Sequence, residues 1–212
     1  MGDCSQLHWV GAGLRSGRIL VRGNVGRHTG EGMIGGRLVV EGNAGDFLAA
    51  EMTGGVVRVS GNAGDCVAAA LAGSPAGMQG GLVVVEGSVG NFTASRLRRG
   101  IVAIGGDCGS GAALEMLAGT LIVAGRLGPQ AGMGMRRGSI VALGPAPVLG
   151  LTFRRGAAWR PTVLALVGSK LSREGFTAAR GMHRDRLYRQ WHGDILSGGG
   201  GEVFTCDDRP LT

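Results

Sequence analysis

The chain has 212 residues, of which 44 are glycine and only 9 are aromatic (3 Trp, 1 Tyr and 5 Phe). Glycine is about three times as frequent as in average globular chains, yet no Gly-X-Y period is present and 44% of the residues are hydrophobic, which excludes collagen and simple disorder. The 22 basic and 15 acidic residues give a net charge of +7, spread over both halves of the chain, so nucleic acid is not the expected partner.

The cysteines and histidines show no ligand spacing. Cys4, Cys66, Cys108 and Cys206 form no CxxC motif and are not paired with the four histidines, so no metal site is predicted. No secretory segment is recognisable near the N-terminus, and no apolar run reaches the roughly 18 residues that a membrane span needs. We therefore expect a cytoplasmic protein with no membrane partner.

A short glycine repeat organises most of the chain. Seven glycines each stand six residues before another glycine, and the intervals between them are 19, 19, 26, 19, 19 and 19 residues. These glycines are Gly17, Gly36, Gly55, Gly81, Gly100, Gly119 and Gly138. The one longer interval contains a seven-residue insertion between Gly64 and Met78. A fixed period of this kind is typical of stacked solenoid repeats.

Each glycine pair encloses a short predicted strand, in which apolar residues alternate at period two, as at Leu38 and Val40. A corner such as Asn24-Val25-Gly26 follows, with residue types that tolerate left-handed backbone. A long apolar side chain lies three residues before each strand's glycine. These side chains are predicted to form a buried core ladder that includes Met33, Met52, Met78, Met116 and Met135.

The pattern predicts an all-β fold, a parallel β-helix of about seven 19-residue coils over residues 11–150. Residues 151–212 are expected to form a C-terminal cap and an arginine-rich tail. Helical apolar spacing from Thr162 to Leu171 predicts a helix that caps the open end of the solenoid, and Glu202 to Thr205 are predicted to form a short strand.

The outward positions of the later coils are too apolar for a wall left in water. The sequence therefore predicts that partner subunits cover this wall, with Ile101, Ile122, Val141 and Leu143 as the interface residues.

No constellation of nucleophile, base and orienting group is recognisable, so no catalytic residue is predicted. The arginines are the remaining candidates, since 21 of the 22 basic residues are arginine. They gather in the first coil, at 96–99 and at 136–137. Solvated or subunit-facing charge and binding of an acidic ligand both remain open for these groups, because stacked guanidinium groups suit several carboxylates.

The repeat written Met33-x-Gly35-Gly36-Arg37-Leu38-Val39-Val40-Glu41-Gly42-Asn43-Ala44-Gly45 resembles the one shared by the C subunit of formylmethanofuran dehydrogenase and the C-terminal domain of the glutamate synthase large subunit. The tail, with Gly150-Leu151-Thr152-Phe153, an aliphatic helix, Gly193-Asp194 and Gly201-Glu202-Val203-Phe204, is similar to the end of the dehydrogenase-type protein. The arginine-rich, lysine-poor chain looks most similar to the C subunit of the bacterial formyltransferase/hydrolase complex of methylotrophs.

This resemblance implies a non-catalytic scaffold in one-carbon metabolism, beside a formyltransferase subunit and an amidohydrolase-like subunit. Together they would pass a formyl group from tetrahydromethanopterin to a methanofuran-type carrier and release formate. No directly bound cofactor is expected, apart from the polyglutamate tail of a methanofuran or methylofuran carrier on Arg15, Arg18 and Arg22. The alternatives are a glutamate synthase-type domain that couples two active sites and an independent β-helix enzyme.

Overall fold

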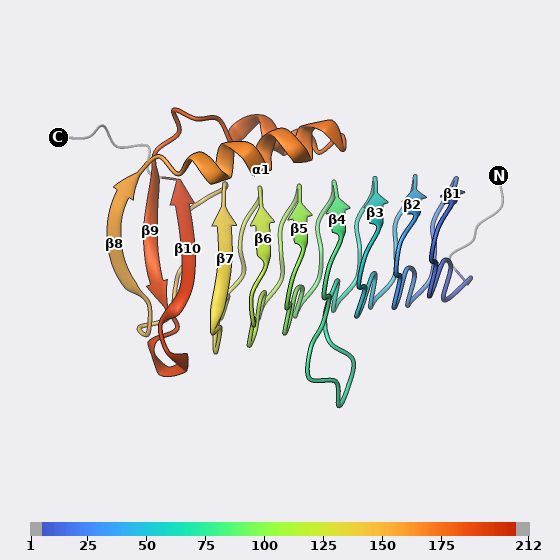
Figure 1. The fold of residues 1–212 in the computed structure, drawn as a ribbon, viewed down its shortest axis with the longest axis horizontal. Helices are drawn as coiled ribbons and strands as arrows, with labels where there is room; N and C mark the ends of the chain where they lie inside the picture. The colour runs from blue at the N-terminus through green and yellow to red at the C-terminus, as the bar shows by residue number, and fades with distance from the viewer. Residues whose placement is uncertain (1–5, 207–212) are drawn as a thin grey trace.

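The structure, a computed structural model, describes residues 6–206 as one ten-stranded, mostly parallel sheet with a single α-helix (Figure 1). The first seven strands are β1 (Arg18–Val21), β2 (Arg37–Val40), β3 (Val56–Val59), β4 (Leu82–Val85), β5 (Ile101–Ile104), β6 (Thr120–Val123) and β7 (Arg137–Ala142). After them come β8 (Arg154–Trp159), α1 (Thr162–Arg173), the 3-10 helix η1 (Thr177–Gly181), β9 (Tyr188–Gly193), the 3-10 helix η2 (Ile195–Ser197) and β10 (Gly200–Cys206). The order in the sheet is β1-β2-β3-β4-β5-β6-β7-β10-β9-β8.

Strands β1 to β7 are parallel and pair in the register of the glycine repeat, so that Arg18 lies opposite Arg37 and Arg37 opposite Val56. The corners after the strands stack as well, because each polar corner side chain accepts a backbone N–H from the next repeat. Asn24 Oδ1 accepts from Asn43 N at 2.8 Å, and Asn43 Oδ1 accepts from Asn62 N at 2.8 Å. These bonds satisfy corner N–H groups that strand pairing does not reach.

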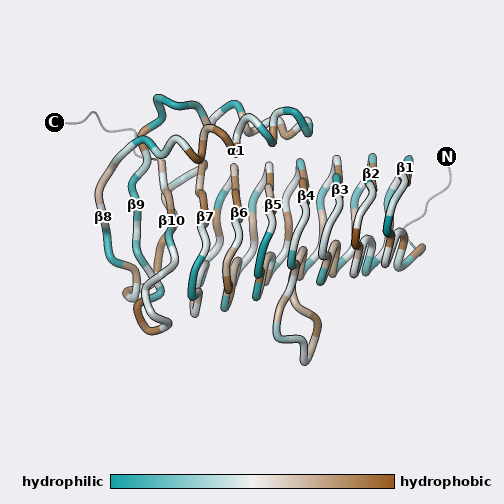
Figure 2. The backbone as a smooth tube through the Cα atoms, viewed as in Figure 1, coloured by the Kyte–Doolittle hydropathy of each residue, from teal (hydrophilic) through white to brown (hydrophobic). Residues whose placement is uncertain are grey.

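The interior is filled by the predicted ladder, and hydrophobic stretches recur in strand after strand (Figure 2). Met33, Met52, Met78, Met116 and Met135 are all fully buried. Methionines of this ladder reach the glycine that begins a later strand. A Cβ added at Gly55 would lie 2.8 Å from Met33 Cε, and φ at Gly55 is +93°, so both space and backbone conformation require glycine there.

The tail continues the sheet. β10 pairs in parallel with β7, and Met135 reaches Gly201 as the earlier methionines reach their glycines. β9 and β8 then add in antiparallel orientation. The predicted place of the helix is therefore wrong: these strands, and not α1, lie at the C-terminal end of the stack, since β10 supplies the backbone partner that β7 needs (Figure 1).

α1 and η1 lie along the outer face of the sheet. Leu164, Leu171 and Phe176 pack against outward residues of β4 to β7, together with Ala179, Met182, Tyr188 and Phe204. Ile122 and Val141 are fully buried in this second cluster, and Ile101 and Leu143 are packed at its margin. The predicted subunit interface is wrong at Ile122 and Val141, because the chain's own C-terminal segment covers them. A subunit contact at Ile101 and Leu143, which are partly exposed, stays a prediction.

Polar contacts fasten the end of this layer to the sheet. Arg58 Nη2, on β3, lies 3.1 Å from Glu86 Oε1 and donates to Gly175 O at 3.3 Å. The other oxygen of Glu86 accepts from Thr177 N at 3.4 Å. The segment after α1 is thus held over β3 and β4 by a half-buried ion pair.

Candidate functional site

Five arginines line a groove on the side of the parallel stack. Its volume is about 940 Å³, and its lining contains five arginines and one carboxylate. The charged residues are Arg96, Arg98, Arg99, Arg136, Arg137 and Glu115. Arg137 begins β7, and the others come from the segments that precede β5, β6 and β7.

The 19-residue register builds the floor of the groove. Arg98, Leu117 and Arg136 occupy one position of the repeat, and the next position carries Arg99, Ala118 and Arg137. Two arginine pairs are therefore separated by one repeat with small or apolar side chains. Two strand spacings of about 4.8 Å place the pairs about 9.6 Å apart.

One wall comes from the seven-residue insertion, which projects from the stack below β4 (Figure 1). Pro75 lines the groove from this loop. Arg96 ties the loop down, because its Nη1 donates to Ser74 O at 3.0 Å while its Nη2 lies 2.7 Å from Glu115 Oε2. Arg96 and Glu115 thus largely neutralise each other, and the other four arginines dominate the charge of the groove.

The opposite wall contains Ser197 of η2, and Asp194 fixes this segment. The Asp194 side chain is buried and accepts from Gly134 N at 3.1 Å and from Leu196 N at 3.0 Å. Burial by itself would raise the pKa of Asp194, but these two N–H groups and the Thr152 hydroxyl hold the pKa below its ordinary value. Asp194 therefore stays ionised and anchors η2 to the residues before β7.

The groove is suited to binding an anionic ligand. Arg98, Arg99, Arg136 and Arg137 are exposed and form no ion pair with a carboxylate of the described chain. Guanidinium groups stay protonated and bind carboxylates or phosphates in bidentate geometry. Two such pairs about 9.6 Å apart fit a ligand with several anionic groups along its length.

The arginines expected to bind the carrier tail lie elsewhere. Arg15, Arg18 and Arg22 are exposed around β1, at the N-terminal end of the stack, and are not part of the groove lining. Arg15 occupies the same position of the repeat as Arg98, but four strand spacings of about 4.8 Å, or about 19 Å, separate them.

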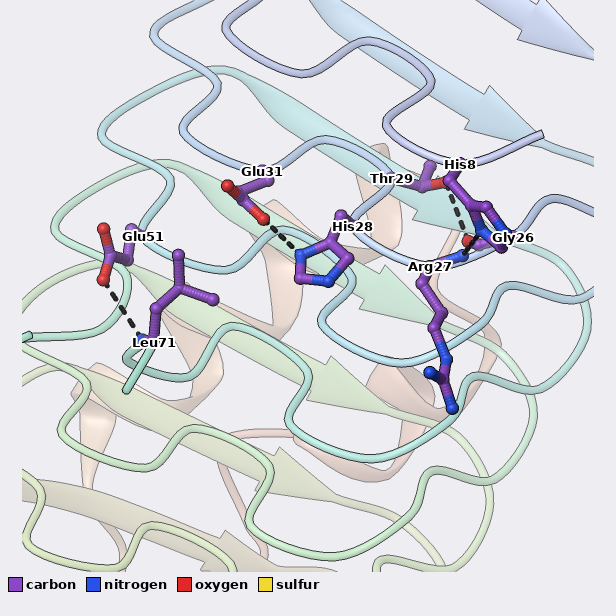
Figure 3. Close-up of polar contacts among 8 residues, drawn as sticks. All are labelled: His8, Gly26, Arg27, His28, Thr29, Glu31, Glu51 and Leu71. Carbon is purple, nitrogen blue, oxygen red and sulfur yellow. Dashed lines mark hydrogen bonds and ion pairs between the residues drawn. The ribbon is translucent and has the colours of Figure 1, made fainter. Parts of the chain in front are cut away.

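A second polar cluster lies near the N-terminus (Figure 3). The His28 and Glu31 side chains form a pair, and His8 Nδ1 accepts from Arg27 N at 2.9 Å. The rings of Trp9, His28 and Phe47 stack, with centroids 5.1 and 4.8 Å apart. Most of these contacts join equivalent places of successive repeats, so the cluster holds the stack together.

The thiols of Cys66 and Cys108 are not in disulfides. Burial raises the pKa of Cys108 to about 12. Burial and, after it, the nearby Asp65 and Asp46 raise the pKa of Cys66. Thiols with raised pKa are poor nucleophiles at neutral pH. Cys4 lies outside the described residues.

Within residues 6–206, no group of three or more His, Cys, Asp or Glu side chains is arranged to hold a metal ion. No helix in the same range is long and apolar enough to cross a membrane.

The sequence indicates the arginines of the groove but not its walls. The arginines before β5 and β7 stand 38 residues apart, which is two periods of the repeat, so their alignment was readable. The walls of the groove could not be predicted from the sequence, because Ser197 reaches the groove only when β9 and β10 pair and η2 folds back.

Comparison with known proteins links the chain to a solved complex. No protein-family model matches the chain, and no curated protein does. Among solved structures, the chain is similar to one in the X-ray crystal structure of the formyltransferase/hydrolase complex (FhcABCD) from Methylorubrum extorquens in complex with methylofuran. The TM-score is 0.86 and the sequence identity is 34%, over 97% of this chain and 76% of that chain.

Proposed function

The chain belongs to the family of this component of the formyltransferase/hydrolase complex, and from that premise we propose that it is the C subunit, the non-catalytic scaffold of such a complex. The observation that carries the proposal is the 34% identity over 97% of the chain. Because the similarity extends through the tail, it supports this assignment over a glutamate synthase-type domain. The scaffold is a parallel β-helix of seven coils, an interpretation supported by the parallel pairing of β1 to β7, whose partners are 19 residues apart except across the insertion between β3 and β4.

The partners that we propose are a formyltransferase subunit and an amidohydrolase-like subunit, in the cytoplasm. The complex would transfer a formyl group from formyl-tetrahydromethanopterin through a methanofuran-type carrier to water, with formate as the product. Because the sequence predicts no nucleophile in this chain, we assign the bond-making steps to the partners.

In this proposal, the arginine groove of the scaffold binds the acidic tail of the carrier. A methanofuran-type carrier supplies the group to which the formyl unit is attached, and its acidic tail carries several carboxylates. Arg98, Arg99, Arg136 and Arg137 would hold such a tail electrostatically. The donor set fits, since four arginines that form no ion pair with a carboxylate of the described chain face about 940 Å³ of open groove. We therefore place the acidic tail here and not on Arg15, Arg18 and Arg22.

Co-expression tests the assignment to the complex. The chain should co-purify with the two partner subunits, and formate should be released from formyl-tetrahydromethanopterin only by the assembled complex. Turnover by the chain alone would instead favour the independent β-helix enzyme. Failure to associate with either partner would overturn the scaffold function.

Calorimetry with tetraglutamate tests the groove separately. Binding should weaken as salt is raised, and Arg98→Glu with Arg136→Glu should lower the affinity at least about tenfold, the equivalent of ~1.4 kcal/mol. Arg126→Glu is the matched control, because Arg126 is also exposed but lies outside the groove. Affinity that is independent of salt, or that falls equally in the control, would contradict the proposed site.

A further inference from the structure

The outer edge of β1 is an open end of the parallel stack. Among residues 6–206, β1 pairs only with β2, whereas β2 to β7 each have a partner on both sides. No strand of residues 6–206 reaches the other side of β1. As far as the described residues go, its backbone groups on that side are therefore available to an added strand.

The side chains of β1 are also less buried than their equivalents in the next strand. Ile19 and Val21 point inward but are only half-buried, whereas Leu38 and Val40 are fully buried. Leu20, which points outward, is 42% exposed. One more strand in the same register would cover Ile19 and Val21 as β1 covers Leu38 and Val40.

The charged side chains of the first repeat itself, residues 6–30, have one sign. Residues 6–30 contain four arginines and no aspartate or glutamate. Arg27 pairs with Asp46, 3.0 Å away in the next repeat. Arg15, Arg18 and Arg22 are exposed and form no ion pair with a carboxylate of the described chain.

We propose that β1 binds an extended acidic segment of a partner protein by parallel strand addition. Acidic side chains of that segment lie on the outward side beside Arg18 and Arg22, and alternate apolar side chains cover Ile19 and Val21. A second copy of this chain does not fit, because pairing two β1 strands would bring their arginines together. This binding is independent of the arginine groove and of the proposed reaction.

The other outer strand lacks these features. β8 is interrupted by a register shift between Arg155 and Ala158, and its residues are mostly exposed. A bulged, charged outer strand is a poor template for pairing. The regular β1 is the edge that can be extended.

The test uses the full chain and the peptide acetyl-Glu-Val-Glu-Val-Glu-Val-Glu-amide, with affinity measured by fluorescence anisotropy. Two further versions carry N-methyl groups, one on the valine amides and the other on the glutamate amides. In a strand, alternate N–H groups point to opposite sides. Methylation of one set should therefore lower the affinity at least tenfold, while methylation of the other set should leave it within twofold.

The second part of the test changes the charge of the peptide and of β1. The peptide with lysine in place of glutamate should not bind, and Arg18→Glu should weaken binding of the acidic peptide at least tenfold. Arg126→Glu should leave the affinity unchanged, since Arg126 lies far along the stack.

Several outcomes would overturn the inference. Equal effects of the two methylated sets would show that the peptide binds by charge alone, without strand pairing. Equally tight binding of heptaglutamate would show that the arginines recognise any polycarboxylate. Self-association that Arg18→Glu alters would identify a second copy as the occupant. Absence of binding, or binding only after removal of residues 1–5, would show that the edge does not serve a partner.

Discussion

Arg37 on β2 and Glu174 after α1 are 137 residues apart in the chain, and their side chains form an ion pair in which Nη2 and Oε2 are 2.6 Å apart. The pair joins the second repeat to the segment that covers the later ones. With the Arg58–Glu86 pair beside it, it marks the point where the outer layer stops, and β1 lies beyond that point.

A double-mutant cycle on Arg37→Met and Glu174→Gln measures the energy of this pair. Both side chains are partly exposed, so we expect a coupling of only about 0.5–1 kcal/mol in the free energy of unfolding, falling in high salt. Chemical denaturation at two salt concentrations provides the measurement. A coupling near zero at low salt would show that packing alone holds the segment.

Met52 tests the core ladder. Met52→Asp places an unpaired charge in a fully buried position against Gly81 and should cost at least about 3 kcal/mol of stability. Met52→Leu preserves the apolar volume and should cost less than about 1.5 kcal/mol. Thermal melting compares the two variants, and equal melting temperatures would contradict the ladder.

Ile122 tests whether α1 covers the outer wall. Since Ile122 is fully buried, Ile122→Glu should destabilise the isolated chain by at least about 3 kcal/mol. Leu20→Glu is the control at an outward position of β1 that is 42% exposed, and should change stability by about 0.5 kcal/mol or less. If Ile122→Glu melts like the native chain, α1 does not stay docked.

Alanine substitutions at Gly138 and Gly13 distinguish the cost of crowding from the cost of backbone strain. A Cβ at Gly138 would lie 2.8 Å from both the backbone O of Gly119 and Met116 Cε, whereas a Cβ at Gly13 would meet nothing within 4 Å, although φ is positive at both residues. Gly13→Ala should cost about 1 kcal/mol from backbone strain alone, and Gly138→Ala distinctly more. The denaturant midpoints of the two variants provide the measurement. Similar losses of stability would show that both Met116 and the backbone at Gly119 move aside.

Asp194 makes stability depend on pH. Its pKa is lower in the folded chain than the ordinary value of 3.8, so its contribution is fully present above pH 3.8 and is lost as pH falls through the folded pKa. Asp194→Asn should cost about 1–3 kcal/mol at neutral pH. The difference from the native chain should shrink below pH 3.8. A difference that stays constant down to about pH 2 would contradict the assigned cause.

The repeat could be read from the sequence because every position recurs after 19 residues with the same physical demand. Met33, Met52 and Met116 fill equivalent places, and Gly55 has no room for a Cβ. The tail has no such recurrence. Helical spacing identified α1, but only the pairing of β10 with β7 decides that α1 lies beside the stack and not across its end.

The same limit explains the prediction for Ile122 and Val141. Their apolar character correctly indicated a covered surface, but composition does not reveal whether the cover belongs to the same chain. The spacing of Arg98 and Arg136 predicts that they are aligned. The position of Ser197 depends on how η2 folds back against the groove, which no local sequence pattern predicts.

The insertion before Met78 leaves the stack and returns without disturbing it. Ala68 N still donates to Leu48 O at 2.8 Å, and Gln79 N donates to Met52 O at 2.7 Å. Loop length is thus uncoupled from the strand register, so residues added or removed around Gly73 should reshape the entrance of the groove at little cost in stability. Redesign of this loop should therefore change the ligand selectivity of the groove while the strands that support it keep their arrangement.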